Sequence, residues 1–440
     1  MTLCGPFHVI EHVVPCQHIR QYPAATVRKQ EDILHLAVKQ YIPIDNPSPK
    51  AGDVTFVTVP GNGFGKELYE PIWHELHGRA KNQGFRIRSI WAADLAQQGQ
   101  SGLINAGRLG LDSNAFDHSR DLLHLINIKR EEMPRPIVGI GHSVGGVALA
   151  QLSLMHPRLF HSIVLLDPVI LRPVTLLRNN ALYDHGILLS PPLQVATYRR
   201  DSWPSREAAA DSFRRNPFYQ TWDARVFDNL IKYGLRDVPK EGQELGNAST
   251  QRDGHSDKSV PVTLTTPLAQ ELTSFARPYY NLPVPDAGPD HPKNRLTHPD
   301  LDPELITSFP FYRPEPAQTF YQLPYLRPSV LYVFGGKSPL SQPELRIDKI
   351  QNTGIGVGGS GGFSAGRVRE ICLQDCSHQV PFEAVNDCAE AIARWFGGEI
   401  GRWCEEEKTF NDRKSLEEKT MVDKEWKRHV PKLQRGKSRL

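Results

Sequence analysis

The sequence predicts an α/β protein with a doubly wound, mostly parallel sheet that a long insertion interrupts. Strand-like apolar runs alternate with helical patterns up to about residue 170 and again from about residue 329. This order is typical of a parallel sheet covered by helices on both faces. Between the two parts the alternation stops and proline becomes frequent. We therefore expect a core formed by residues 1–170 and 329–400, an inserted cap or lid at 171–328, and a charged tail at 401–440.

The expected elements follow from two local patterns. Strands are short runs rich in β-branched and aromatic residues, and helices carry apolar residues every three or four positions. In chain order, strands are expected at 7–14, 33–41, 54–59, 85–91, 136–140, 162–166, 330–334 and 368–373. Helices are expected at 67–80, 116–128, 144–155 and 382–396, with shorter helical pieces at 203–214 and 227–233 inside the insertion.

Composition excludes several classes of function. The chain has 440 residues, a formal net charge of +3 and 39% apolar residues, which is typical of a folded globular protein. Basic residues form no broad stripe, so no nucleic-acid partner is expected. The apolar runs are strand-length, so no membrane span is expected. The N-terminus lacks the pattern of a secretory signal, which favours a reducing, intracellular compartment.

Two patterns superficially match metal or cofactor motifs. Cys372 and Cys376 form one close pair, but no second pair stands at zinc-site spacing. Residues 354–359 match the G-x-G-x-x-G pattern, but no helical pattern follows them, which favours a flexible loop over a dinucleotide site. We expect no metal and no cofactor.

The nucleophile is predicted by the run Gly141-His142-Ser143-Val144-Gly145. A bare G-x-S-x-G occurs by chance in roughly one chain of this length in seven. Here it stands between a strand and a helix, the strand–turn–helix context that a nucleophile elbow requires. Glycines suit this turn because its backbone approaches neighbouring elements closely. We predict that Ser143 is the nucleophile.

A serine hydroxyl needs a general base, because it is a weak nucleophile until its proton is removed. In this arrangement the histidine follows the serine in the chain. His378 stands in the loop between the last expected strand and the helix after it. Several other histidines, such as His74, His77, His118 and His124, fall on expected helices, where a surface role is the default. We predict that His378 is the base.

The acid that orients the histidine is harder to place. Its usual position is the loop after the strand at 330–334, and that loop, Gly335-Gly336-Lys337-Ser338-Pro339, has no carboxylate. Asp167 ends the strand at 162–166, a second position from which a carboxylate can reach the histidine. We predict Asp167 as the acid, with Glu344 as the alternative.

Two backbone N–H groups are expected to stabilise the negatively charged oxygen of a tetrahedral intermediate. One is the N–H of Val144, the residue after the nucleophile. The other is expected from the glycine-rich loop at 60–65, with Phe64 as the first choice and Asn62 as the second.

The last three residues, Ser438-Arg439-Leu440, closely match the Ser-Lys-Leu address that a peroxisomal import receptor reads. We therefore expect the import receptor as a partner and the peroxisome as the location.

With these residues in view, the chain resembles the α/β-hydrolase superfamily. More narrowly, it resembles filamentous-fungal hydrolases that include peroxisomal lipase-like proteins and members encoded in host-selective toxin clusters. One departure is Pro60-Gly61, where members of the superfamily often have His-Gly. The resemblance implies an ester or thioester hydrolase in a secondary-metabolite pathway. Its segments are 8–23, 34–47, 62–67, the Ser143 elbow, 337–339 and 377–382.

The function expected from these residues is cleavage of a carboxylic ester through an acyl-enzyme on Ser143, as in esterases and lipases. An aromatic cap formed by about residues 171–328 is expected to cover an apolar acyl site, with packing inside the cap as the alternative role of its Tyr and Phe residues. Two alternatives stay open: an acyl-CoA thioesterase, and a non-catalytic binding protein on the same fold. Epoxide hydrolase and dehalogenase chemistry is disfavoured, because it needs an aspartate where this chain has Ser143.

Overall fold

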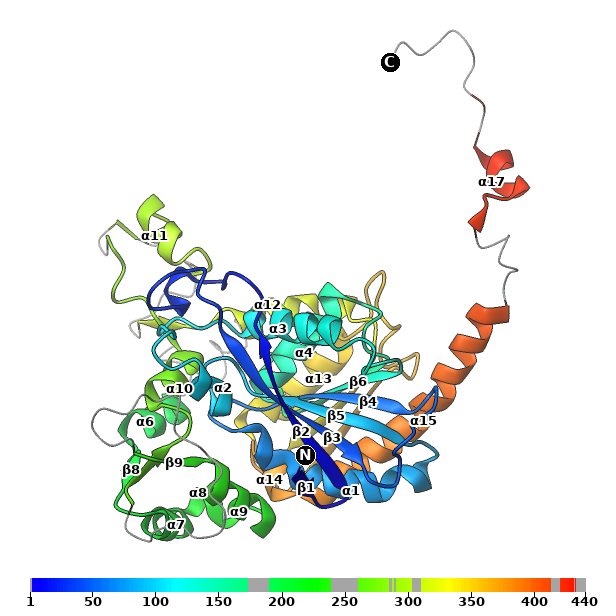
Figure 1. The fold of residues 1–440 in the computed structure, drawn as a ribbon. Coiled ribbons are helices and arrows are strands. Elements are labelled where there is room, and N and C mark those ends of the chain that lie inside the picture. Colours follow the sequence, from blue (N-terminus) through cyan, green and yellow to red (C-terminus); the bar gives the residue numbers. More distant parts are fainter. Residues whose placement is uncertain are drawn as a thin grey trace.

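The computed structural model describes residues 2–172, 190–238, 260–284, 287–288, 290–302, 310–412, 420–430 and 432. A nine-stranded sheet crosses the centre of this part of the chain (Figure 1). Its strands are β1 (Thr2–Cys4), β2 (Phe7–Pro15), β3 (His35–Pro43), β4 (Val54–Val59), β5 (Ile87–Ala93), β6 (Ile137–His142), β7 (Ser162–Leu166), β13 (Ser329–Gly335) and β14 (Val368–Leu373).

The strand order in the sheet is β1-β2-β3-β5-β4-β6-β7-β13-β14. The pairs from β5 to β14 are parallel, and β1, β2 and β3 extend the sheet through antiparallel pairs. This topology confirms the predicted mostly parallel, doubly wound sheet. Because the parallel strands end at one edge, the loops after β6, β7, β13 and β14 meet there.

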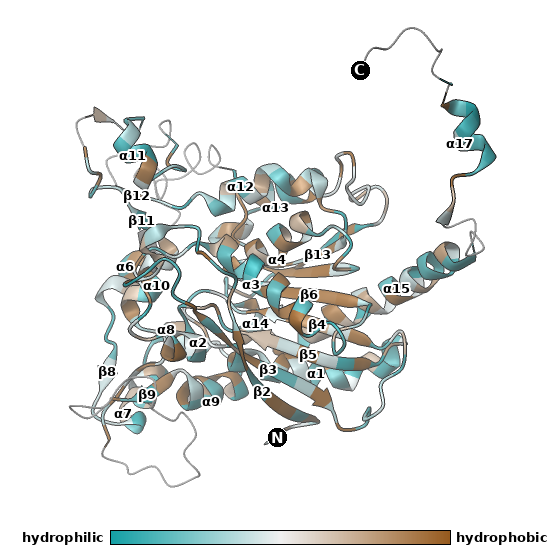
Figure 2. Cartoon of the chain, turned by 45° about the horizontal axis from the view of Figure 1, so that its top comes forward, coloured by the Kyte–Doolittle hydropathy of each residue, from teal (hydrophilic) through white to brown (hydrophobic). Residues whose placement is uncertain are grey.

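Helices cover both faces of the sheet, and alternate strand residues point to opposite faces. Phe56, Ile140 and Val164 pack into the buried cluster that includes α1 (Glu70–Ala80) and α15 (Val385–Asp412). On the other face lie α3 (Ala115–Ile128), α4 (Val144–Met155) and α13 (Pro343–Asn352). Figure 2 shows the consequence, with hydrophobic strands inside and helices that are hydrophilic on their outer sides.

The residues between β7 and β13 form a group of small elements at one side of the sheet (Figure 1). They include a three-stranded sheet, β8-β10-β9, and a two-stranded sheet, β11-β12. The domain boundaries expected from the sequence stay predictions. The described elements are α6 (Ser190–Tyr198), β8 (Ser202–Trp203), α7 (Arg206–Arg214), α8 (Pro217–Gln220), α9 (Ala224–Tyr233), β9 (Leu235–Asp237), β10 (Val262–Leu264), α10 (Leu268–Phe275), β11 (Arg277–Pro278), α11 (Pro292–Thr297), β12 (Phe311–Tyr312) and α12 (Glu315–Gln322).

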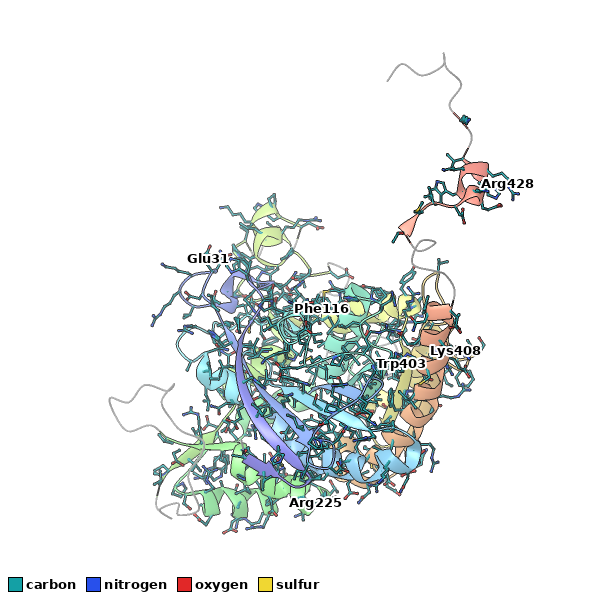
Figure 3. All side chains as sticks on the ribbon, turned by 45° about the vertical axis from the view of Figure 1, so that its right-hand side comes forward. Glu31, Phe116, Arg225, Trp403, Lys408 and Arg428 are labelled. Atoms are coloured by element: carbon teal, nitrogen blue, oxygen red, sulfur yellow. The ribbon has the colours of Figure 1, made fainter. Side chains whose placement is uncertain are left out.

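Two expected helices of the core differ in their bounds, and inside the insertion the expected pieces become α7, which begins after β8, and α9, which begins three residues early. The helix expected at 67–80 begins as the 3-10 turn η2 (Lys66–Tyr69) and becomes α1 only at Glu70, where Pro71 suits a helix start. The helix expected at 382–396 is a short α14 (Val380–Glu383) followed by α15, which continues to Asp412. Figure 3 shows Trp403 and Lys408 on this extension. It also shows Arg428 on α17 (Lys424–His429), away from the rest of the protein. The Ser438-Arg439-Leu440 address lies outside the described residues.

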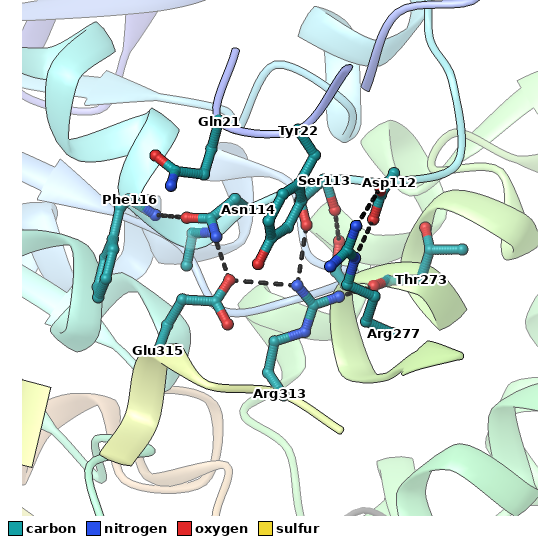
Figure 4. A network of polar contacts seen from close by, with 12 residues as sticks. Gln21, Tyr22, Asp112, Ser113, Asn114, Phe116, Thr273, Arg277, Arg313 and Glu315 are labelled. Atoms are coloured by element: carbon teal, nitrogen blue, oxygen red, sulfur yellow. Dashed lines mark hydrogen bonds and ion pairs between the residues drawn. The ribbon is translucent and has the colours of Figure 1, made fainter. Parts of the chain in front are cut away.

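Buried ion pairs fasten the elements between β7 and β13 to the loop that precedes α3 (Figure 4). Arg277 binds both carboxylate oxygens of Asp112, with Nε–Oδ1 2.6 Å and Nη2–Oδ2 2.8 Å. Glu315 Oε1 accepts a hydrogen bond from Arg313 at 3.2 Å and from the backbone N–H of Ala115 at 3.0 Å. Arg277 and Glu315 are buried, so each charge depends on its partner.

We predict that Arg277→Gln destabilises the protein, because it leaves the Asp112 carboxylate without its charged partner. Breaking a buried pair from one side costs about 3 kcal/mol, and this loss should appear as a lower free energy of unfolding in a urea titration. Arg394→Gln is the control, because Arg394 is 74% exposed in its pair with Glu390 and should change stability little. Equal effects of the two substitutions would contradict the role given to Arg277.

Candidate active site

The Ser143 side chain projects from a sharp turn between β6 and α4. Ser143 has φ 56° and ψ −117°, a backbone conformation that L-residues rarely adopt. Its N–H donates to Leu166 O at 3.0 Å. A Cβ at Gly145 would lie 2.4 Å from Val59 O, and one at Gly141 would lie 2.5 Å from Gly145 O. Both motif glycines are therefore required by close backbone approach, and the turn holds Ser143 at the strand-end edge of the sheet.

The structure brings Ser143, His378 and Asp167 into one hydrogen-bonded chain. His378 Nε2 lies 2.9 Å from Ser143 Oγ, and His378 Nδ1 lies 2.6 Å from Asp167 Oδ2. His378 comes from the loop after β14, and Asp167 directly follows β7. Parallel strands far apart in the sequence thus deliver the three side chains to one place.

Asp167 is fully buried and has φ 42°. Besides His378, its carboxylate accepts hydrogen bonds from Ser338 Oγ at 2.6 Å, from Gly335 N at 3.2 Å and from Ser341 Oγ. Burial raises the pKa of Asp167, but the hydrogen bonds from His378, Ser338 and Ser341 and the His378 charge outweigh it and lower the pKa below its usual value. The carboxyl group is therefore held ionised.

The loop after β13 has no carboxylate, but it supplies hydrogen-bond donors to one. Ser338 and Ser341 donate to Asp167, so this loop supplies donors to an acid that comes from the neighbouring strand end. Glu344, the alternative acid, lies exposed at the start of α13. His378 Nδ1 contacts Asp167 instead.

Hydrogen bonding in the glycine-rich loop disagrees with the choice of Phe64 as an oxyanion donor. The Phe64 N–H already donates to Gly61 O at 3.3 Å, which closes a turn. The Gly61 N–H donates to Tyr69 Oη and the Gly63 N–H donates to Gln98 Oε1, each at 2.8 Å. Among the N–H groups of residues 61–64, only that of Asn62, the second choice, has no acceptor in the described part of the chain.

The position of Asn62 also suits this role. A Cβ at the preceding Gly61 would lie 3.4 Å from Ser143 Cβ, so the loop runs beside the nucleophile. The Asn62 side chain donates to Glu271 O at 3.1 Å and accepts from Gln98 Nε2. Val144 is the first residue of α4, where an N–H has no acceptor within the helix. The roles of Val144 and Asn62 as donors stay predictions.

Sequence reasoning missed a second hydrogen-bonded chain behind the site. The Tyr69 hydroxyl lies 2.8 Å from His142 Nδ1, and His142 Nε2 lies 3.1 Å from the backbone oxygen of His378. A carbonyl only accepts, so Nε2 carries the proton and Nδ1 accepts from Tyr69. The chain therefore links the Gly61 loop to the backbone of His378. His142 stood inside the predicted motif, whereas no sequence signal marked Tyr69.

Aromatic side chains lie beside this chain, and one of them, Trp222, belongs to the expected cap. Phe382 packs against Phe64 and Trp222 with ring centroids 4.9 and 4.7 Å apart, and against His142 at 5.6 Å. Trp222 follows α8 and therefore comes from the region between β7 and β13. These rings form an apolar wall next to the Ser143 turn.

The aromatic residues near the end of the expected cap pack away from Ser143, and the acyl-covering role of the cap stays a prediction. Phe320 of α12 packs into the core, and Tyr312 of β12 packs against a small apolar cluster. Tyr321 and Tyr325 are exposed. Phe309 lies outside the described residues.

Within the described ranges, no three His, Cys, Asp or Glu side chains gather in a way that would hold a metal ion. None of the described helices is long and apolar enough to cross a bilayer.

Comparisons with known proteins agree with the fold. The model of the "Alpha/beta hydrolase family" matches residues 56–395. "Type I acyl-CoA thioesterase mpaH" from Penicillium roqueforti is 38% identical over 438 residues, 98% of this chain and 97% of that protein. "Abhydrolase domain-containing protein AKT2" from Alternaria alternata is 30% identical over 263 residues, 60% of this chain and 84% of that protein. The solved structure of the peroxisomal hydrolase Lpx1 from Saccharomyces cerevisiae has a TM-score of 0.65 and 17% identity, covering 96% of this chain and 100% of its own.

We predict that His142 makes the folded state sensitive to acid. Burial lowers the pKa of His142 to about 3, whereas the exposed side chain of the unfolded chain has a pKa of 6.5. Between these values the unfolded state binds one more proton, so the free energy of unfolding falls as the pH falls, by about 1.4 kcal/mol per pH unit. His142→Gln should flatten this slope in urea titrations between pH 6.5 and the acid limit.

The control for this slope is His429→Gln on the exposed helix α17. An unchanged slope in His142→Gln would show that His142 is not kept neutral by its surroundings.

Proposed function

The chain belongs to the alpha/beta hydrolase family, and from this premise we propose that it is a serine hydrolase that cleaves acyl-CoA thioesters. The observation that carries the proposal is the hydrogen-bonded chain from Ser143 through His378 to the buried, ionised Asp167. Such a chain activates a hydroxyl for attack on an acyl carbon and stabilises the imidazolium that results.

The proposed reaction proceeds in two halves. Ser143 Oγ attacks the carbonyl carbon while His378 Nε2 takes the hydroxyl proton. The tetrahedral intermediate, whose oxygen accepts from the Val144 and Asn62 N–H groups, then collapses. The carbon–sulfur bond breaks, and the thiol leaves with the proton from His378. A water molecule next attacks the acyl-enzyme with His378 as base, which releases a carboxylic acid and restores Ser143.

The choice of a thioester rests on a relative. The Penicillium protein named acyl-CoA thioesterase is similar over nearly the whole of both chains, so the similarity extends over the segments that carry Ser143, Asp167 and His378. This similarity favours an acyl-CoA thioester as the substrate over the carboxylic ester that the sequence first suggests. An oxygen ester remains the second candidate, because the same serine would attack either carbonyl carbon, with the same histidine as base and the same N–H groups as donors to the carbonyl oxygen. The peroxisomal location expected from the last three residues stays a prediction.

We predict that Ser143→Ala abolishes turnover and leaves the fold intact, because the substitution removes only the attacking oxygen. The loss in kcat should be at least about four orders of magnitude, measured by release of free thiol from acyl-CoAs of several chain lengths alongside p-nitrophenyl esters. Ser364→Ala, at an exposed position, is the control. A wild-type protein that hydrolyses neither class and does not react with a fluorophosphonate would support a non-catalytic binding protein instead.

We also predict that Asp167→Asn lowers kcat by about four orders of magnitude with little change in KM, because the amide no longer holds the correct histidine tautomer. Glu344→Gln should leave kcat near the wild-type value. Steady-state kinetics of the two variants separate the candidate acids. A large loss in Glu344→Gln with activity kept in Asp167→Asn would reverse the assignment.

A further inference from the structure

A cleft of about 620 Å³ lies between the antiparallel end of the sheet and the elements between β7 and β13. Residues of β2 and β3 line one wall, residues of α9 and β9 line the other, and Gly63 and Phe64 lie where the cleft meets the glycine-rich loop. Neither Ser143 nor His378 lines it. The cleft is therefore next to the site but distinct from it, and nothing in the proposed reaction uses it.

Positive charge predominates in this cleft, which we call the basic cleft. Six lysine and arginine side chains line it against three carboxylates. Some of the cations are already paired: Lys66 lies 2.7 Å from Asp94, and Lys39 lies 3.2 Å from Glu67. These pairs are structural, so binding of a ligand would depend on the cations that remain.

Arg236 on β9 is the clearest of these. Its Nε and Nη1 atoms are buried and have no hydrogen-bond acceptor among the described residues. Burial lowers the pKa of Arg236, but a guanidinium stays charged at any physiological pH. Leaving buried charged donors without an acceptor is costly, and an anion in the cleft would remove that cost.

Two more cations add to the positive charge of the basic cleft. Lys232 forms no ion pair in the described part of the chain, and its ammonium lies 4.8 Å from the centre of the Tyr233 ring. Arg199 pairs with Glu271 through Nη2, but its buried Nε has no acceptor there. Arg236, Lys232 and Arg199 all line the cleft. Arginine in particular suits phosphate, because its planar fork donates two parallel hydrogen bonds.

The cleft and the acyl site share one loop. Gly63 and Phe64 line the cleft, while Gly61, two residues before Gly63, lies so close to the nucleophile turn that its Cβ would be 3.4 Å from Ser143 Cβ. The Asn62 side chain also donates to the backbone of Glu271, the residue that pairs with Arg199. A ligand that occupies both places must have an acyl group at one end, anionic groups at the other and a slender connection between them.

We propose that the basic cleft binds the phosphate groups of the coenzyme A portion of the substrate while its acyl carbonyl lies at Ser143. This inference rests on the proposed function. A coenzyme A thioester has the required form, because an extended pantetheine arm joins its sulfur to its phosphates. Arg236 and Lys232 hold the phosphates, and the arm passes the loop at residues 62–64.

Binding tests the cleft without turnover. Full-length Ser143→Ala protein is titrated with coenzyme A by calorimetry, with and without Arg236→Gln or Lys232→Gln. Loss of one charged hydrogen-bonding partner should raise the dissociation constant roughly tenfold. Arg236→Lys should recover part of the affinity. Arg215→Gln is the control, because Arg215 is exposed at the end of α7 and does not line the cleft.

Kinetics then compare two substrates with the same acyl group, the coenzyme A thioester and the N-acetylcysteamine thioester, which lacks the phosphates. Arg236→Gln should raise KM for the coenzyme A thioester roughly tenfold more than for the truncated one. Equal losses for both substrates, or unchanged coenzyme A affinity in both cleft variants, would overturn the proposal.

Failure of the proposed function looks different. If the wild-type protein hydrolyses neither thioester while Ser143→Ala binds coenzyme A in an Arg236-dependent way, the reaction is wrong and the cleft assignment stands. If thioesters are hydrolysed but coenzyme A does not bind to Ser143→Ala, the reaction stands and the cleft assignment falls.

Discussion

The site depends on the Asp167 carboxylate, a negative charge held in the interior of the protein. An isolated buried carboxylate would take up a proton, because burial disfavours its charged form. Here Ser338, Ser341 and the backbone of Gly335 donate to it, and His378 completes the set. These donors come from the end of β13, from the loop that follows it and from the loop after β14. Keeping the charge therefore requires that parallel strands end at one edge in the observed register.

The same edge constrains the nucleophile through close backbone packing. Gly141 and Gly145 allow β6, α4 and the end of β4 to approach closely enough that any Cβ would collide with a carbonyl oxygen. The Ser143 backbone is held in a conformation with positive φ by the bonds that this packing permits. Behind it, the neutral His142 joins Tyr69 to the backbone of His378, so His378 and the glycine-rich loop are positioned by one buried chain.

The elements between β7 and β13 supply residues both to the surroundings of Ser143 and to the basic cleft. Glu271 on α10 anchors the Asn62 side chain, and Trp222 packs against Phe382 beside the site. Arg277, Arg313 and Glu315 bind the loop before α3 and fix these elements to the sheet (Figure 4). The basic cleft lies between the sheet and this attached group, and its Arg236 belongs to the group.

Local pattern was sufficient for every strand of the central sheet except β1. The apolar runs of the parallel strands and the strand–turn–helix context of Ser143 are properties of neighbouring residues, so the sequence by itself determined them. It also placed His378 and Asp167 at the ends of strands that meet at one edge, which is why the structure brings both to Ser143.

Only the tertiary structure decided which polar atoms find partners. The sequence predicts Phe64 before Asn62 as a donor, because it does not show that the Phe64 N–H closes a turn or that Tyr69 and Gln98 accept from the N–H groups of Gly61 and Gly63. Likewise, nothing near Ser338 in the chain reveals that it donates to a carboxylate on another strand. Hydrogen bonds between residues far apart in sequence depend on distances and directions that exist only after the strands have packed, and local periodicity carries no information about them.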